Sequence, residues 1–215
     1  MAADPQIKLQ PILVWDVPVR IFHWLLVTCC VGAWVTSESE RLMMWHLAFG
    51  YSAGLLVLLR VVWGLIGSRY ARFSSFASTP RETLAYLRAM LTGRSDHPVG
   101  HNPLGGWMIW ALLSCVLLTV ASGYLLYHEI LTWDDLHEGF ANLGLGLVLA
   151  HVAAAVVMGW VEKQSLVKAM LHGRKMGRPE QAIRRPWYTV GTLLLVVMVY
   201  VFVEILQGKL PALTS

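Results

Sequence analysis

The chain contains five apolar runs that are each long enough to cross a lipid bilayer. A spanning helix needs about 20 residues, and its backbone must satisfy its own hydrogen bonds because lipid offers no partners. With 215 residues in all, five such spans leave short connections and no sizeable soluble domain. The sequence therefore predicts an all-α integral membrane protein, with a four-helix bundle followed by a fifth, C-terminal transmembrane helix. The expected spans are about 18–36, 46–66, 106–127, 137–160 and 187–206.

The composition excludes other broad classes of protein. Hydrophobic residues make up 56% of the chain and charged residues 14%, whereas ordinary soluble domains carry about 25% charged residues. Neither a soluble globule nor a disordered chain could keep so much apolar surface in water. The net charge of +4 comes from Lys and Arg residues gathered in particular loops. This clustering favours a role in membrane orientation over nucleic-acid binding.

The loop charges predict which way the helices point. The connections 67–105 and 161–186 contain five and seven Lys or Arg residues, whereas 37–45 and 128–136 are acidic overall. Because cytoplasmic loops are enriched in Lys and Arg, we expect the N-terminus in the cytoplasm and the C-terminus on the outer side.

Two short surface helices are expected within the basic loops. Thr79, Pro80 and Glu82 form an N-cap, a first-turn proline and a capping-box acid, which together indicate a helix start. A second helix is expected from Ser165 to Leu171, because Gly173 follows it as a stop signal.

Four histidines near the ends of the spans form the most informative pattern. His137 and His151 lie 14 residues apart in one span, which is about 1400° of rotation and roughly 21 Å of rise, so they face nearly the same way at two depths. His23 begins the first span at the expected cytoplasmic level and matches His151. His46 begins the second span at the outer level and matches His137. The expected topology rests on Lys and Arg residues alone. The match in depth between the histidines is therefore independent support for the pairing.

Two His–His pairs stacked across a membrane bundle suit two six-coordinate haems, each held by one imidazole from each of two helices. A zinc or di-iron site would need three or more protein ligands at one depth. Because the chain has no C-x-x-C-H motif, covalent c-type haem is not indicated. Gly50, Gly54 and Gly144 would let a flat macrocycle approach the helices closely. The prediction is a haem-binding bundle with an inner pair, His23 and His151, and an outer pair, His46 and His137.

Alternatives to these ligand assignments stay open. A single histidine in a span can also be a hydrogen-bonded interior residue or an interfacial one. His128 ends the third span at the level of the outer pair, which makes it an alternative outer ligand. The histidines in the basic loops are expected to be solvated; they are His97, His101 and His172.

Two arginines and three cysteines in the spans also need an assignment. Arg20 and Arg60 lie near the cytoplasmic ends of the first two spans, where guanidinium groups could pair with the propionates of the inner haem. A contact with lipid headgroups is an equally good role for them. The cysteines are expected to be buried free thiols; they are Cys29, Cys30 and Cys115.

Several short motifs resemble a known family. Together they look like the bacterial cytochrome b561 family, which includes the b-type cytochrome subunits of nickel-iron hydrogenases. The resemblance runs from about Trp15 to Lys175, and it places the four paired histidines at the family's haem-ligand positions. The motifs are Val14–Trp24, His46–Tyr51, Leu59–Gly64, Ser68–Phe73 and His101–Gly106.

The resemblance implies a dihaem b-type cytochrome of the bacterial inner membrane. It would carry electrons between the quinone pool and a periplasmic redox partner, such as a cytochrome c or a hydrogenase small subunit, with two haem b as cofactors and quinone as a diffusible substrate. Residues 1–175 would form the dihaem transmembrane domain, and residues 176–215 a cytoplasmic linker and the C-terminal helix. Quinone oxidoreductase activity and a homodimer are left open. The alternative is a haem-free transporter or assembly factor whose histidines handle protons or metal.

Overall fold

A computed structural model describes residues 9–92 and 98–209 of the chain. All five expected spans are helices that are long and apolar enough to cross a membrane, so the chain is a multi-pass membrane protein. The predicted fold class is confirmed. The spans are α1 (Val17–Thr36), α2 (Met43–Ile66), α4 (Pro103–Tyr127), α5 (Asp134–Val161) and α7 (Tyr188–Leu206).

Three of these helices, α2, α4 and α5, begin three residues earlier than the apolar pattern predicts, and in α4 and α5 a cap or acidic residues in the first turn explain the earlier start. In α4 the Asn102 side chain accepts a hydrogen bond from the backbone N–H of Gly105, and Pro103 occupies the first turn. In α5 the first turn contains Asp134 and Asp135, whose negative charges are favourable at a helix N-terminus. Capping thus extends a span beyond its apolar stretch.

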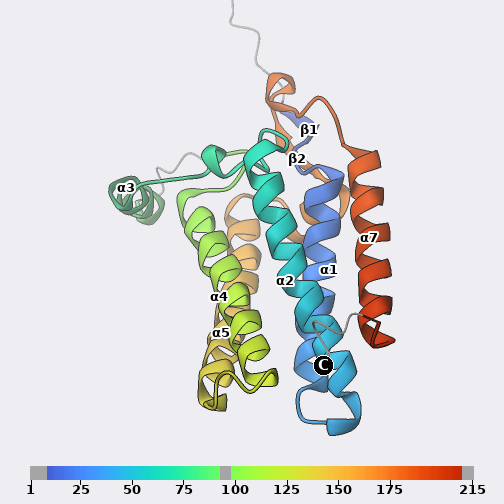
Figure 1. Ribbon diagram of the computed structural model, residues 1–215. Helices are drawn as coiled ribbons and strands as arrows, with labels where there is room; N and C mark the ends of the chain where they lie inside the picture. Colours follow the sequence, from blue (N-terminus) through green and yellow to red (C-terminus); the bar gives the residue numbers. More distant parts are fainter. Residues whose placement is uncertain (1–8, 93–97, 210–215) are drawn as a thin grey trace, which may run out of the picture.

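The helices form two groups (Figure 1). α1, α2 and α7 pack against one another, and α4 pairs with α5 along its length. α2 also contacts α4, which joins the groups. None of the residues Asp134–Val161 is buried, so α5 has much less protein cover than a helix inside a packed bundle.

A polar cluster anchors the start of α1. The Asp16 carboxylate is fully buried and caps the helix by accepting a 2.8 Å hydrogen bond from the backbone N–H of Val19. Its second oxygen accepts a 3.0 Å bond from the indole N–H of Trp63 near the end of α2. This one carboxylate therefore holds the beginning of α1 beside the end of α2.

A small unit that the apolar pattern did not reveal covers the same end of the bundle. β1 (Gln10–Leu13) pairs antiparallel with β2 (Arg174–Gly177), with Gln10 opposite Gly177. The expected surface helices are present as α3 (Pro80–Leu91), with its capping box, and α6 (Leu166–His172), which Gly173 ends in a left-handed conformation. The remaining elements are three 3₁₀ turns, η1 (Glu40–Leu42), η2 (Phe73–Ser75) and η3 (Pro179–Gln181).

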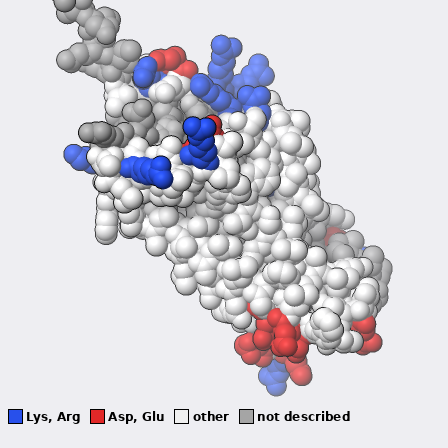
Figure 2. Space-filling model, turned by 90° about the vertical axis from the view of Figure 1, so that its left-hand side faces the viewer, with Lys and Arg blue, Asp and Glu red and all other residues white. Residues whose placement is uncertain are grey.

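The charges separate along the long axis of the molecule. Figure 2 shows Lys and Arg mainly at one end, Asp and Glu mainly at the other, and a wide uncharged belt between them. The basic end is the one that carries the strands, α3 and α6 (Figure 1). The three cysteines are free thiols, as expected, with Cys29 and Cys115 buried and Cys30 partly buried.

A buried ion pair joins the end of α5 to β2. Lys175 Nζ lies 3.2 Å from a carboxylate oxygen of Glu162, and both side chains are 4% exposed. Gln164 donates a hydrogen bond to the same carboxylate and accepts one from the backbone N–H of Met176. Both charges are thus compensated in a place with little access to water.

Removal of one charge from this pair should destabilise the protein strongly. Glu162→Gln keeps the side-chain shape but leaves the Lys175 ammonium buried without its counter-ion, which is expected to lower the free energy of unfolding by about 3 kcal/mol. Unfolding in detergent measures this change. Glu180→Gln is the matched control because the Glu180 pair with Arg178 is exposed. Equal effects of the two substitutions would contradict the expectation.

Candidate functional site

The outer pair of histidines faces across the bundle. His46 lies in the first turn of α2 and His137 in the first turn of α5. Their ring centroids are 6.2 Å apart, and the ring planes are inclined at 79°. The structure therefore brings these two predicted residues together from helices that are far apart in the sequence.

Backbone carbonyls fix both rings of the outer pair. Nδ1 of His46 lies 2.9 Å from the carbonyl oxygen of Ala33, and Nδ1 of His137 lies 3.0 Å from that of Thr119. Since a carbonyl only accepts, each Nδ1 carries the proton and each Nε2 keeps its lone pair. Metal-bound histidines almost always donate their second ring N–H in this way. The sequence could not reveal these carbonyls, because any residue type supplies one.

The spacing of the outer pair fits one metal ion between two imidazoles. A metal–nitrogen bond of about 2 Å on each side, together with the ring radii, puts the two centroids roughly 6 Å apart. The observed separation of 6.2 Å agrees with this value. The two rings need no hydrogen bond between them, because each Nδ1 already has a backbone carbonyl as its partner.

The inner pair is less tightly defined. His23 on α1 and His151 on α5 lie within electrostatic range of each other. Nδ1 of His23 is buried and has no hydrogen-bond partner among the described residues. The His23 ring packs edge-on against Trp24, with the centroids 5.1 Å apart. The structure therefore places the members of each predicted pair near each other, while their role as ligands stays a prediction.

The face of α5 that bears the histidines is only partly covered by the rest of the protein. His137, Gly144 and His151 follow one another at intervals of seven residues, so they share one face of the helix. All three are only partly covered, and no residue of Asp134–Val161 is buried. Gly50, one turn after His46, has no heavy atom within 4 Å of the place where a Cβ would be. A Cβ on Gly144, by contrast, would lie 3.5 Å from Sγ of Cys115, so this glycine faces α4 rather than open space.

Gly54 and Gly123 make room for protein side chains rather than for a macrocycle. A Cβ on Gly54 would lie 2.9 Å from Val120 of α4, so this glycine allows α2 and α4 to pack closely. A Cβ on Gly123 would lie 2.8 Å from Cε1 of His137. Sequence reasoning missed Gly123, which leaves space for the His137 ring beside α4.

Other metal chemistry has no support in the described residues. Within 9–92 and 98–209, no group of three or more His, Cys, Asp or Glu side chains is placed to hold a metal ion. The histidines occur instead in twos, at two depths. This arrangement suits a metal whose other ligands come from a macrocycle rather than from the protein.

The two arginines near the inner pair lie in different surroundings. Arg60 is buried, donates a 2.9 Å hydrogen bond to the carbonyl of Ala71, and stacks over the ring of Phe73. Its Nη1 has no partner in the described part of the chain. Arg20 donates a 2.8 Å bond to the carbonyl of Leu171 and lines a hollow at the surface. Arg60 thus has a buried donor available for an anionic group within the bundle.

The remaining histidines differ in burial. His128 ends α4 with its Nε2 buried and its ring 4.4 Å from that of Tyr124. His172 is exposed, as expected, and His97 lies outside the described residues. The expectation that His101 is solvated is wrong. Its ring packs 4.5 Å from that of Trp15 and 4.9 Å from that of Phe76, because the loop before α4 lies against the residues that precede α1 and follow η2.

The surroundings of His101 make stability depend on pH. Burial, followed by the positive charges of Arg60 and Lys175, lowers the pKa of His101 to about 3. The unfolded chain takes up this proton near pH 6.5, so His101 destabilises the fold progressively as the pH falls from about 6.5 towards 3.

The substitution His101→Phe should reduce the loss of stability on acidification, since Phe fits an aromatic environment and takes up no proton. Unfolding midpoints in detergent between pH 7 and about pH 4 measure this effect. His172→Phe is the control at an exposed site and should keep the wild-type pH dependence. An unchanged slope in His101→Phe would show that other groups carry the dependence.

Comparisons with known proteins agree with this geometry. The family model described as "Prokaryotic cytochrome b561" matches residues 14–173. No solved structure matches the chain. The matched region contains both histidine pairs and ends before β2 and α7.

Three curated relatives are similar over most or half of the chain. A probable Ni/Fe-hydrogenase B-type cytochrome subunit of Rhizobium leguminosarum bv. viciae is 25% identical and is aligned over 82% of this chain and 95% of its own length. Its counterpart in Cupriavidus necator is 25% identical over 74% and 85% of the two chains. The probable Ni/Fe-hydrogenase 1 B-type cytochrome subunit of Escherichia coli K12 is 26% identical over 54% and 60%. The family match covers well over half of the chain, and we conclude that this protein belongs to the prokaryotic cytochrome b561 family.

Proposed function

We propose that this protein is a dihaem b-type cytochrome that carries electrons across the membrane between the quinone pool and a periplasmic redox partner. Family membership already makes it a membrane b-type cytochrome, and it implies haem b and electron transfer. The proposal adds the number of haems, their ligands and the two redox partners. The observation that carries it is the opposed pair His46 and His137, with both Nδ1 atoms held by carbonyls.

The chain's own residues would bind and orient the cofactors. His46 and His137 would hold the outer haem, and His23 and His151 the inner one. Arg60 is the better placed arginine for an inner propionate, because its buried Nη1 lacks a partner among the described residues. Haem supplies a one-electron iron centre when bound. Ligation by two histidines leaves no open position for oxygen, which favours electron transfer over oxygen chemistry.

The orientation and partners follow from the charges and the relatives. The basic end would face the cytoplasm, which puts the N-terminus inside and the acidic end in the periplasm (Figure 2). The relatives are named as hydrogenase cytochrome subunits, so a hydrogenase small subunit is the partner we propose first. The acidic end would then be the docking side.

The proposal is tested by counting haem in the purified protein. A pyridine haemochrome assay and a reduced-minus-oxidised spectrum should give two haem b per chain. If a well-folded protein made with ample haem contains none, the alternative of a haem-free protein whose histidines handle protons or metal is favoured. One haem per chain would disprove the dihaem assignment but leave the family unaffected.

Single histidine substitutions should remove one haem each. His46→Ala and His137→Ala should lower the content from two haems to about one per chain, because one axial ligand of the outer pair is lost. His23→Ala and His151→Ala should do the same at the inner site, with a different residual spectrum. Identical residual spectra for all four variants would contradict the pairing. If His128→Ala removed the outer haem and His46→Ala did not, His128 would be the outer ligand.

The space beside His137 gives a second prediction. Gly123→Val adds atoms where the His137 ring lies, so the ring must move and the outer haem should be lost or weakened, with haem content falling towards one per chain. Gly146→Val is the matched control, because a Cβ at Gly146 meets nothing within 4 Å. Haem content and low-temperature spectra of both variants measure the difference. Two haems in Gly123→Val with an unchanged spectrum would argue against His137 as a ligand.

A further inference from the structure

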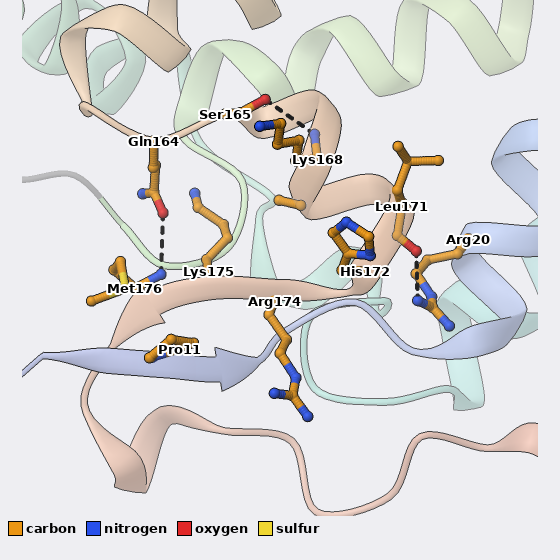
Figure 3. A pocket seen from close by; sticks show the side chains of 11 residues that line it. Pro11, Arg20, Gln164, Ser165, Lys168, Leu171, His172, Arg174, Lys175 and Met176 are labelled. Atoms are coloured by element: carbon orange, nitrogen blue, oxygen red, sulfur yellow. Dashed lines mark hydrogen bonds between the residues drawn. The ribbon is translucent and has the colours of Figure 1, made fainter.

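A hollow of about 640 Å³ opens at the basic end, beyond the histidine sites. Its walls come from β1, the start of α1, α6 and β2. Figure 3 shows that Arg20 reaches it from α1, Lys168 and His172 from α6, and Arg174 from β2. Two segments that are far apart in the sequence, the N-terminal segment with Arg20 and the α6–β2 segment, therefore bring basic side chains around one space.

The positive charge of this hollow is not neutralised within the protein. The lining contains no Asp or Glu. Lys175 also lines it, but Lys175 is already paired with Glu162. Among the residues that the structure describes, Arg20, Lys168 and Arg174 form no salt bridge, and Nε of Arg20 is buried without a hydrogen-bond partner. The hollow thus offers uncompensated donors to an anion.

The donors favour a phosphate group. Guanidinium groups bind phosphate oxygens through several parallel N–H donors, and Lys adds a compact charge. The backbone anchors one side of the site, since Arg20 Nη1 is held 2.8 Å from the carbonyl of Leu171. Basic pockets at the ends of transmembrane helices are typical places for anionic lipid headgroups.

An exposed apolar stripe leads from the hollow into the uncharged belt. Trp24, Val27 and Val31 follow Arg20 at helical spacing, so they lie on the same side of α1, and all three are exposed. Trp24 also connects the stripe to the wall of the hollow, because its indole N–H donates a 3.4 Å bond to the carbonyl of Met170 in α6. A ligand with a phosphate and acyl chains fits this surface better than a free anion does.

We propose that this hollow binds the phosphate group of an anionic membrane lipid, with the acyl chains lying along Trp24, Val27 and Val31 of α1. The site is separate from both histidine pairs and does not depend on the identity of the redox partner. Binding would fasten α6 and β2 to the membrane surface through Lys168 and Arg174.

The test uses the delipidated holoprotein in a neutral detergent. Dioleoylphosphatidylglycerol and dioleoylphosphatidylcholine are titrated separately, and native mass spectrometry measures the bound fraction. The anionic lipid should bind at least about tenfold more tightly. The double substitution Lys168→Gln with Arg174→Gln should weaken it about thirtyfold, from two lost surface charges.

The matched control is the double substitution Arg184→Gln with Arg185→Gln. It removes the same charge from the same end, at exposed residues outside the hollow, and should leave the affinity within about twofold of wild type. Haem content, measured in parallel, should stay at the wild-type value in both double variants. If the pocket variant loses haem, the single substitution Arg174→Gln replaces it in the comparison.

Three results would overturn the proposal. Equal affinity for the two lipids would show that the site does not distinguish lipids by the charge of their headgroups. Equal weakening in the control variant would assign the binding to the general charge of the basic end. Displacement of the lipid by inorganic phosphate at an equal concentration would identify the ligand as a soluble anion. The haem count is independent of all three, so failure here is distinguishable from failure of the dihaem assignment.

Discussion

α5 carries two histidines towards α1 and α2, yet none of its residues is buried. A membrane helix gains little from apolar contact alone, since lipid tails are as apolar as its neighbours. What orients α5 must therefore be specific: its pairing with α4, the ion pair at its end and the hydrogen bond of His137. His137 contributes through Thr119, and Glu162 through Lys175. Haem bound between the helices would complete the packing that the protein leaves unfinished.

The carbonyl partners of His46 and His137 would keep these two histidines ready to bind a metal, as proposed above. A free histidine can place its proton on either nitrogen, and only one tautomer presents Nε2 as a ligand. Ala33 and Thr119 select that tautomer before any cofactor arrives. Because these acceptors belong to helices α1 and α4, the ligands on α2 and α5 are oriented by their neighbours rather than by their own helices.

The sequence predicted the spans because they depend on periodicity. It also expected His46 and His137 at one depth, and the structure brings these two rings together. It missed the first turns of α4 and α5, where a cap and acidic residues extend the helix beyond its apolar run. It also missed the β1–β2 pair and the burial of His101, since both depend on contacts between distant segments. The carbonyls that orient the outer pair carry no side-chain signal at all. Gly123 could have been noticed only by asking which residues of α4 face His137.

The strand pair at the basic end has a consequence for the order of assembly. Gln10 and Gly177 are opposite one another, and the four helices that carry or enclose the histidines lie between them in the chain. During synthesis, β1 cannot form its hydrogen bonds with β2 until the segment after α6 has been made. Pairing of β1 with β2 then joins the segment before α1 to the segment after α6. α7 follows β2 in the chain, so the last span is added to a bundle whose first and fourth spans are already tied together.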